Sequence, residues 1–140
     1  MTNPSRHLVL HNAFKKGLLV APPDGRYSVF MWLSFAWRNL LEKTIKEGHG
    51  QNHLPIFIIR HKNLPYMSFD VSANKETKKT IFAYHNGIIV DELRYIEAVN
   101  IWLGKLYWDG TFTDYFWFVS VDDVPDIDFD KIMVLLAKKE

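Results

Sequence analysis

The sequence predicts an α+β fold, a mostly antiparallel sheet of about five strands with two main helices and a short C-terminal helix packed against it. Two long segments repeat apolar residues at helical spacing, and an Asn-Gly pair separates two short apolar runs. Several other apolar runs have the length of strands. Strands joined by hairpins and partly segregated from helices are typical of α+β folds.

The two main helices are expected at 28–47 and 92–106. In the first, apolar residues recur three or four positions apart, and Gly48 follows as a stop signal. In the second, Asp91 stands where an N-cap belongs. A short third helix is expected to begin near Asp128 and to end in basic residues, which suits the helix dipole.

The strands are expected to pair as antiparallel hairpins, 55–61 with 66–71 and 80–84 with 88–90. Asn86-Gly87 lies in the second connection, and this dipeptide favours tight hairpin turns. A further strand at 113–121 carries large aromatic residues on both faces, so it needs cover on both. The residues expected to be nearly fully buried are Leu33, Trp37, Leu40, Ile56, Ile58 and Val99.

Composition indicates one globular domain over residues 1–140. The chain is 48% hydrophobic and contains ten Phe, six Tyr and five Trp, which suits a packed core and not a disordered chain. It contains no cysteine, which excludes disulfides, thiolate zinc sites and cysteine nucleophiles. The longest strongly apolar stretch, Tyr27 to Leu41, is too short to span a bilayer, and a cytoplasmic location is expected.

Motifs for metals, cofactors and catalysis are incomplete. His49 and His53 have a spacing used by zinc ligands, but Gly50 stands where a zinc protease needs glutamate. Asp126, Asp128 and Asp130 alternate as in a calcium loop, which then lacks its glycine and its bidentate glutamate. No nucleophile elbow or glycine-rich phosphate loop occurs, so no metal, cofactor or catalytic residue is predicted.

Charge is unevenly distributed along the chain. Residues 1–108 contain 14 Lys and Arg against 8 Asp and Glu, a net +6, whereas residues 109–130 contain seven Asp and no Lys or Arg. The acidic segment overlaps the aromatic one. Exposed rings bordered by charge are typical of protein-binding surfaces. The residues expected to form such a surface are Trp108, Tyr115, Trp117, Asp122, Asp123 and Asp126.

These residues favour a non-enzymatic protein that binds another protein. By analogy of size and composition alone, small inhibitors such as the immunity proteins that neutralise bacterial toxins are of this kind, since an acidic surface complements a basic enzyme. One alternative is a diverged hydrolase or nuclease-like enzyme using acids such as Asp70, Asp91 and Asp114. A second is a nucleic-acid-binding module in which basic residues lie near aromatic ones: Lys75, Lys78 and Lys79 near Tyr84, and Arg60 and Lys62 beside Tyr66.

Overall fold

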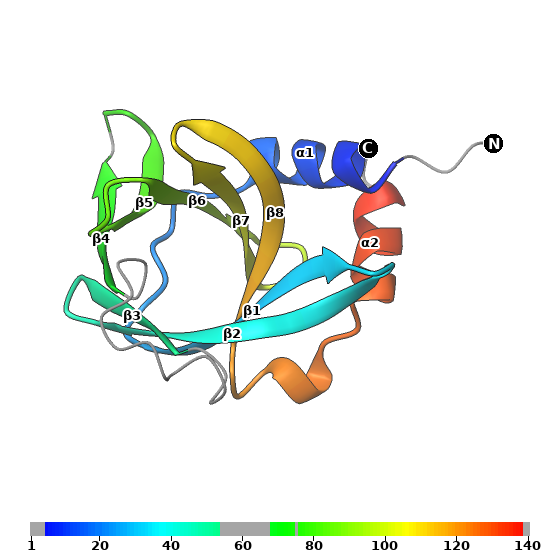
Figure 1. The fold of residues 1–140 in the computed structure, drawn as a ribbon. Coiled ribbons are helices and arrows are strands. Elements are labelled where there is room, and N and C mark those ends of the chain that lie inside the picture. Colours follow the sequence, from blue (N-terminus) through cyan, green and yellow to red (C-terminus); the bar gives the residue numbers. More distant parts are fainter. Residues whose placement is uncertain (1–4, 54–67, 75, 139–140) are drawn as a thin grey trace.

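The computed structural model describes residues 5–53, 68–74 and 76–138, and the strands of these residues form a closed antiparallel barrel (Figure 1). Each strand pairs with its neighbours in sequence, and β8 returns to pair with β1. The α+β prediction of a sheet of about five strands is therefore wrong. The strands are β1 (Gly25–Leu33), β2 (Ala36–Lys46), β3 (His49–His53), β4 (Ser68–Asn74), β5 (Lys79–Tyr84), β6 (Ile89–Ile96), β7 (Ile101–Trp108) and β8 (Thr111–Ser120).

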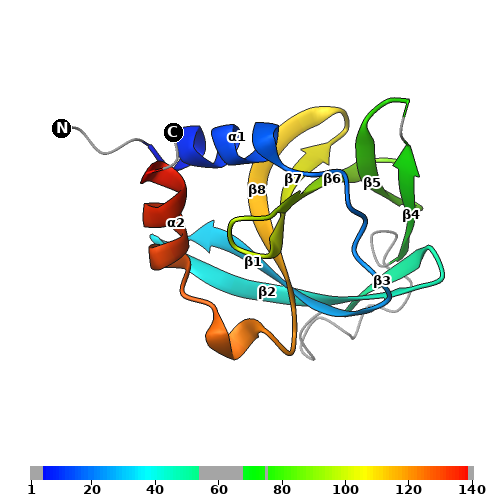
Figure 2. The same cartoon turned by 180° about the vertical axis from the view of Figure 1, so that it is seen from behind.

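Two helices, α1 (Arg6–Lys16) and α2 (Phe129–Lys138), pack next to each other on the outside of the barrel (Figures 1 and 2). No helix was expected where α1 lies, and Ser5 caps it by accepting a hydrogen bond from the Leu8 amide. A short 3₁₀ helix (Val124–Asp126) lies between β8 and α2. Within the described residues, neither helix is long and apolar enough to cross a membrane.

The segment expected to be the first main helix is instead the hairpin of β1 and β2. Its two-residue turn is Ser34-Phe35, with positive φ angles of 51° and 63° between the paired residues Leu33 and Ala36. This backbone suits the twist of a hairpin, but Ser-Phe is not the Asn-Gly or Asp-Gly pair that marks such turns. Both faces of β1 carry apolar residues, which removed the alternation that would have indicated a strand.

The second main helix is likewise a hairpin, made of β6 and β7. The chain reverses at residues 97–100, where Asn100 has a φ of 56° and its amide donates to the Ile96 carbonyl. No glycine or proline marks this turn, so the apolar residues on either side of it resembled one continuous helical stripe.

Other expectations are confirmed. The hairpin around Asn86-Gly87 is antiparallel as expected, although β5 pairs with residues 90–93 and its return strand continues to Ile96, past the expected 88–90. The strand β8 lies within one or two residues of the strand expected at 113–121. The helix α2 begins after Asp128, whose side chain accepts hydrogen bonds from the amides of Asp130 and Lys131. The expected strand at 55–61 lies outside the described residues, and residues 68–71 belong to β4, which pairs with β3 and β5.

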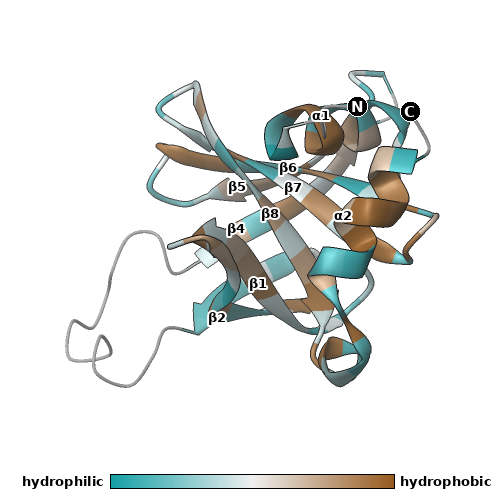
Figure 3. Cartoon of the chain, turned by 90° about the vertical axis from the view of Figure 1, so that its right-hand side faces the viewer, coloured by the Kyte–Doolittle hydropathy of each residue, from teal (hydrophilic) through white to brown (hydrophobic). Residues whose placement is uncertain are grey.

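Two apolar cores share the strand β8. Phe116 and Phe118 face the barrel interior, whereas Tyr115, Trp117 and Val119 pack beneath α1 and α2 on the outside. Hydrophobic residues of α2 complete this outer core, where Ile132 and Leu136 are buried (Figure 3). The expectation that β8 needs cover on both faces is thus confirmed.

The list of expected core residues is less accurate. Leu33 is 42% exposed beside the β1–β2 turn, so its predicted burial is wrong. Trp37, Leu40 and Val99 are half-buried, and Ile56 and Ile58 lie outside the described residues.

The two ends of the barrel interior differ. We call the end with the β2–β3 and β6–β7 turns the filled end, because inward aromatic residues occupy it. There Tyr27 stacks on Phe118 and Phe69 stacks on Phe82, with ring centroids 4.3 and 4.6 Å apart. Gly50 makes room for this packing, since a Cβ at that position would lie 2.0 Å from the Phe69 ring. We call the opposite end, with the β1–β2 and β7–β8 turns, the cavity end.

Candidate functional site

A cavity of about 180 Å³ lies inside the barrel toward the cavity end. Its walls are mostly apolar, and the apolar ones come from β1, β2, β6, β7 and β8. The apolar lining residues are Val29, Met31, Leu40, Leu41, Ile89, Leu106 and Phe116. Four polar residues also line it: Lys43, Asn52, Tyr84 and Asp91. We call these four the buried polar quartet, because all of them are buried.

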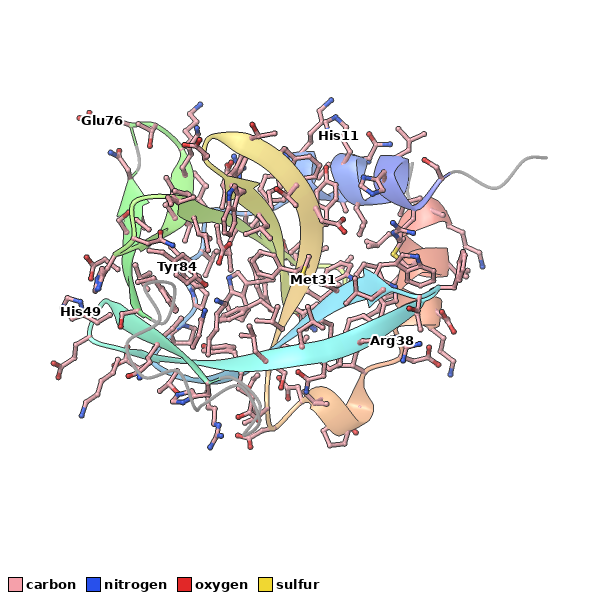
Figure 4. All side chains as sticks on the ribbon, viewed as in Figure 1. His11, Met31, Arg38, His49, Glu76 and Tyr84 are labelled. Carbon is pink, nitrogen blue, oxygen red and sulfur yellow. The ribbon has the colours of Figure 1, made fainter. Side chains whose placement is uncertain are left out.

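Strand alternation directs the quartet inward. Lys43 lies between the inward residues Leu41 and Ile45 on β2, and it pairs across the sheet with Asn52 on β3. Tyr84 ends β5, and Asp91 lies near the start of β6. Met31 and Tyr84 lie inside the ring of strands, whereas His49 and Glu76 extend outside it (Figure 4).

Hydrogen bonds join the quartet into a chain. The Lys43 ammonium donates to Asn52 Oδ1 at 2.6 Å and also to the Tyr84 hydroxyl. The Tyr84 hydroxyl in turn donates to Asp91 Oδ2 at 3.2 Å. Lys43 Nζ and Asp91 Oδ2 are 3.8 Å apart, so Tyr84 lies between the two charged groups and links them.

Burial shifts the titration of both charged groups toward neutral pH. Lys43 is 3% exposed and Asp91 is 2% exposed. Loss of hydration lowers the pKa of Lys43 to about 8, against the opposing effect of the Asp91 charge. Loss of hydration likewise raises the pKa of Asp91 to about 6, partly offset by Lys43 and by the Tyr84 hydrogen bond. Burial also raises the pKa of Tyr84 well above its usual value.

The arrangement offers donors and acceptors at one wall of an apolar cavity. Small-molecule sites have this form, with apolar walls and a few convergent polar groups that orient the ligand. Perturbed titration of buried groups in a cavity is a further mark of functional sites. No family model, curated protein or solved structure matches the chain. The site is therefore interpreted from its own geometry.

The structure separates the residues expected to form a partner-binding surface. Tyr115 and Trp117 are buried in the outer core, whereas Trp108 is 54% exposed at the cavity end. Asp122, Asp123 and Asp126 are exposed but follow β8, at the opposite end of that ten-residue strand. A strand of this length spans about 30 Å at roughly 3.3 Å per residue, so the six residues do not form one face.

The histidines and aspartates considered as metal ligands form hydrogen bonds with other protein groups. His49 Nδ1 lies 2.8 Å from Asp70 Oδ1, and His53 Nε2 lies 2.7 Å from the Thr44 hydroxyl. Asp128 caps α2. In the part of the chain that the structure describes, no group of three or more His, Cys, Asp or Glu residues is placed to hold a metal ion.

Sequence reasoning missed the quartet as a site. Lys43 lies within the segment expected to be the first main helix, and Asp91 was expected to cap the second. The sequence does contain one sign of the site, which is the position of the charge within an apolar-polar alternation. Lys43 and Asp91 each have a polar residue one position away and apolar residues two positions away on both sides. Within a strand, that pattern places a charge on the apolar face, which is unusual unless the charge is paired or functional.

Proposed function

We propose that this protein binds a small, mostly apolar molecule carrying one polar group, inside the cavity end of its barrel. The observation that carries this proposal is an apolar cavity lined at one place by four buried, mutually hydrogen-bonded polar residues. Eight-stranded barrels are just wide enough either to be filled by side chains or to hold one small ligand. Here the filled end follows the first pattern, and the cavity end is suited to the second.

Cavity size restricts the ligand. An engineered cavity of about 150 Å³ lined by apolar side chains binds benzene. A cavity of about 180 Å³ therefore suits a molecule with a single ring or a short branched chain. The quartet would orient its polar group, since Lys43 and Tyr84 supply donors and Asn52 and Asp91 supply acceptors. A hydroxyl or a carbonyl meets both requirements.

Titration with one-ring probes tests the proposal. Backbone amide shifts would be followed by NMR while phenol, benzaldehyde or toluene is added to the full chain. We expect saturable shifts at strands lining the cavity, and weaker binding of toluene, which has no polar group. Ile89→Trp should block binding by filling the cavity, whereas Thr113→Trp, at an exposed position of β8, should not. Absence of cavity-directed shifts for every probe would reject the proposal.

The protein-binding role expected from the aromatic and acidic segment remains a separate prediction, as does the cytoplasmic location. Trp108, Asp122, Asp123 and Asp126 are exposed and free of the buried cores, so they are the members of the expected set that a partner could reach. Inhibition of a toxin or enzyme would depend on these surface residues and not on the cavity.

A further inference from the structure

We infer that Lys43 captures small aldehydes or ketones as a reversible imine on its side-chain nitrogen. The inference rests on the proposed function and names the ligand class of the same cavity. It goes further than binding, because it assigns covalent chemistry to one member of the buried polar quartet.

The surroundings of the Lys43 amine are suited to this chemistry. Its two close hydrogen-bond partners, Asn52 and Tyr84, are uncharged groups. The nearest carboxylate, on Asp91, is 3.8 Å away and is bridged by the Tyr84 hydroxyl. The amine makes no direct hydrogen bond to a carboxylate, so loss of its proton breaks no such bond and removes only the attraction to Asp91. Reactive lysines in other proteins are activated in the same way, by desolvation in an apolar pocket.

The hydrogen-bond chain supplies a path for the proton. The Lys43 ammonium donates to Tyr84, which donates to Asp91, so a proton leaving Lys43 can reach the carboxylate by two short transfers. Burial lowers the pKa of the amine to about 8 and raises that of the carboxyl to about 6, so the two values lie much closer together than in water and the transfer costs less. The transfer leaves the neutral amine that attacks a carbonyl carbon and holds the proton on Asp91 for the carbonyl oxygen.

The reaction balances with these groups alone. The neutral nitrogen of Lys43 attacks the carbonyl carbon, a C–N bond forms, and the carbonyl oxygen takes a proton passed back from Asp91 through Tyr84. The nitrogen of this carbinolamine then returns one proton to the Asp91 carboxylate through Tyr84, and Asp91 passes that proton to the hydroxyl, which leaves as water while a C=N bond forms. The remaining N–H proton of the protonated imine returns to Asp91. One amine and one carbonyl compound give one imine and one water, with no oxidant or reductant.

The competing interpretation gives Lys43 and Asp91 a purely structural role. Many buried ion pairs have no catalytic use. Lys43 Nζ also lies 4.9 and 4.7 Å from the ring centres of Phe69 and Tyr84, and both rings stabilise its positive charge. The two interpretations differ in one observable property, namely whether a carbonyl compound that enters the cavity becomes attached to Lys43.

Reductive trapping distinguishes them. The full chain would be incubated with benzaldehyde and sodium cyanoborohydride, which reduces an imine to a stable amine, and then digested for peptide mass mapping. We expect one added benzyl group on Lys43 before any on Lys46, an exposed lysine of the same strand that serves as an internal control. Excess phenol should slow labelling of Lys43 and leave Lys46 unaffected.

Variants complete the test. Lys43→Arg keeps the charge and cannot form an imine, so the early label should disappear. Tyr84→Phe keeps the amine but removes the proton path, and should slow the labelling of Lys43.

Labelling confined to surface lysines in the folded wild-type chain, while phenol still shifts the cavity amides, would overturn the imine and leave the binding function intact. Failure of both phenol and benzaldehyde to reach the cavity would overturn both proposals. The wild-type map alone decides the matter if Lys43→Arg fails to fold.

Discussion

The filled end and the cavity end are built from the same strands but use their inward positions differently. At the filled end every inward position in the stacked cluster carries an aromatic or aliphatic residue, and the rings of Tyr27, Phe69, Phe82 and Phe118 contact one another. At the cavity end β2, β3, β5 and β6 place Lys43, Asn52, Tyr84 and Asp91 inward, and a cavity lies beside them. One half of the interior is therefore packed with rings, while the other keeps buried charges and a cavity, both of which cost stability.

Truncating a ring at the filled end should give the largest loss of stability. Phe118 is fully buried between the Tyr27 and Phe82 rings, so Phe118→Ala should cost about 3–5 kcal/mol of unfolding free energy. Leu106 is half-buried and already lines a cavity, so Leu106→Ala should cost less, about 2 kcal/mol. Urea denaturation of both variants measures the difference, and equal losses would show that the two ends are equally packed.

Removing one charge of the quartet should have the next largest effect. Asp91→Asn leaves the buried ammonium of Lys43 without a counter-charge, and breaking a buried pair this way costs about 3 kcal/mol. Replacing both groups, as Lys43→Met with Asp91→Leu, should recover most of that loss, because apolar residues often substitute for a buried pair without penalty. A double variant as unstable as Asp91→Asn would mean that the pair is needed for folding.

How far the sequence predicts this molecule depends on local signals. The helix α2 was predictable because Asp128, an apolar stripe and terminal lysines all agree, and the β5–β6 hairpin because Asn86-Gly87 marks it. The barrel was not predictable, since the turns at Ser34-Phe35 and Asn100 carry no glycine and the strands they join are apolar on both faces. Lys43 and Asp91 are 48 positions apart in sequence, and only closure of the barrel brings them together.

The pH dependence of stability should differ between wild type and the double variant. The pKa of Asp91 is raised from 3.8 to about 6, so its contribution to stability is present at acid pH and is lost as pH rises through 6. The pKa of Lys43 is lowered from 10.5 to about 8, so its contribution is present in alkali and is lost as pH falls through 8. The pair therefore stabilises the fold least between pH 6 and 8.

Unfolding free energies measured from pH 4 to 10 test this expectation. The double variant should compare most favourably with wild type in the neutral window, by an amount on the order of 1–3 kcal/mol at ~1.4 kcal/mol per pKa unit. A difference between the two proteins that does not vary with pH would show that Lys43 and Asp91 titrate as they do in the unfolded chain.

The smallest effects on stability are expected at the exposed residues of the predicted partner-binding set. Trp108 is 54% exposed, and Asp122 and Asp123 are exposed at the other end of β8, so Trp108→Ala and the pair Asp122→Asn with Asp123→Asn should each change stability by less than about 0.5 kcal/mol. Trp117→Ala is the matched control, because that ring is fully buried and its loss should cost about 3–5 kcal/mol.

Binding kinetics then separate the two surfaces. If a protein partner recovered by co-purification binds at the acidic end, the aspartate variant should slow its association and flatten the salt dependence, as rim charges do, while Trp108→Ala leaves it unchanged. If the partner binds at the cavity end, Trp108→Ala should speed dissociation and the aspartate variant should have no effect. Since these residues lie about 30 Å apart along β8, an effect of both variants on one partner would require a contact running the length of the barrel. A marked loss of stability in Trp108→Ala would instead show that this ring is needed for packing, and would remove it from the set of partner-binding candidates.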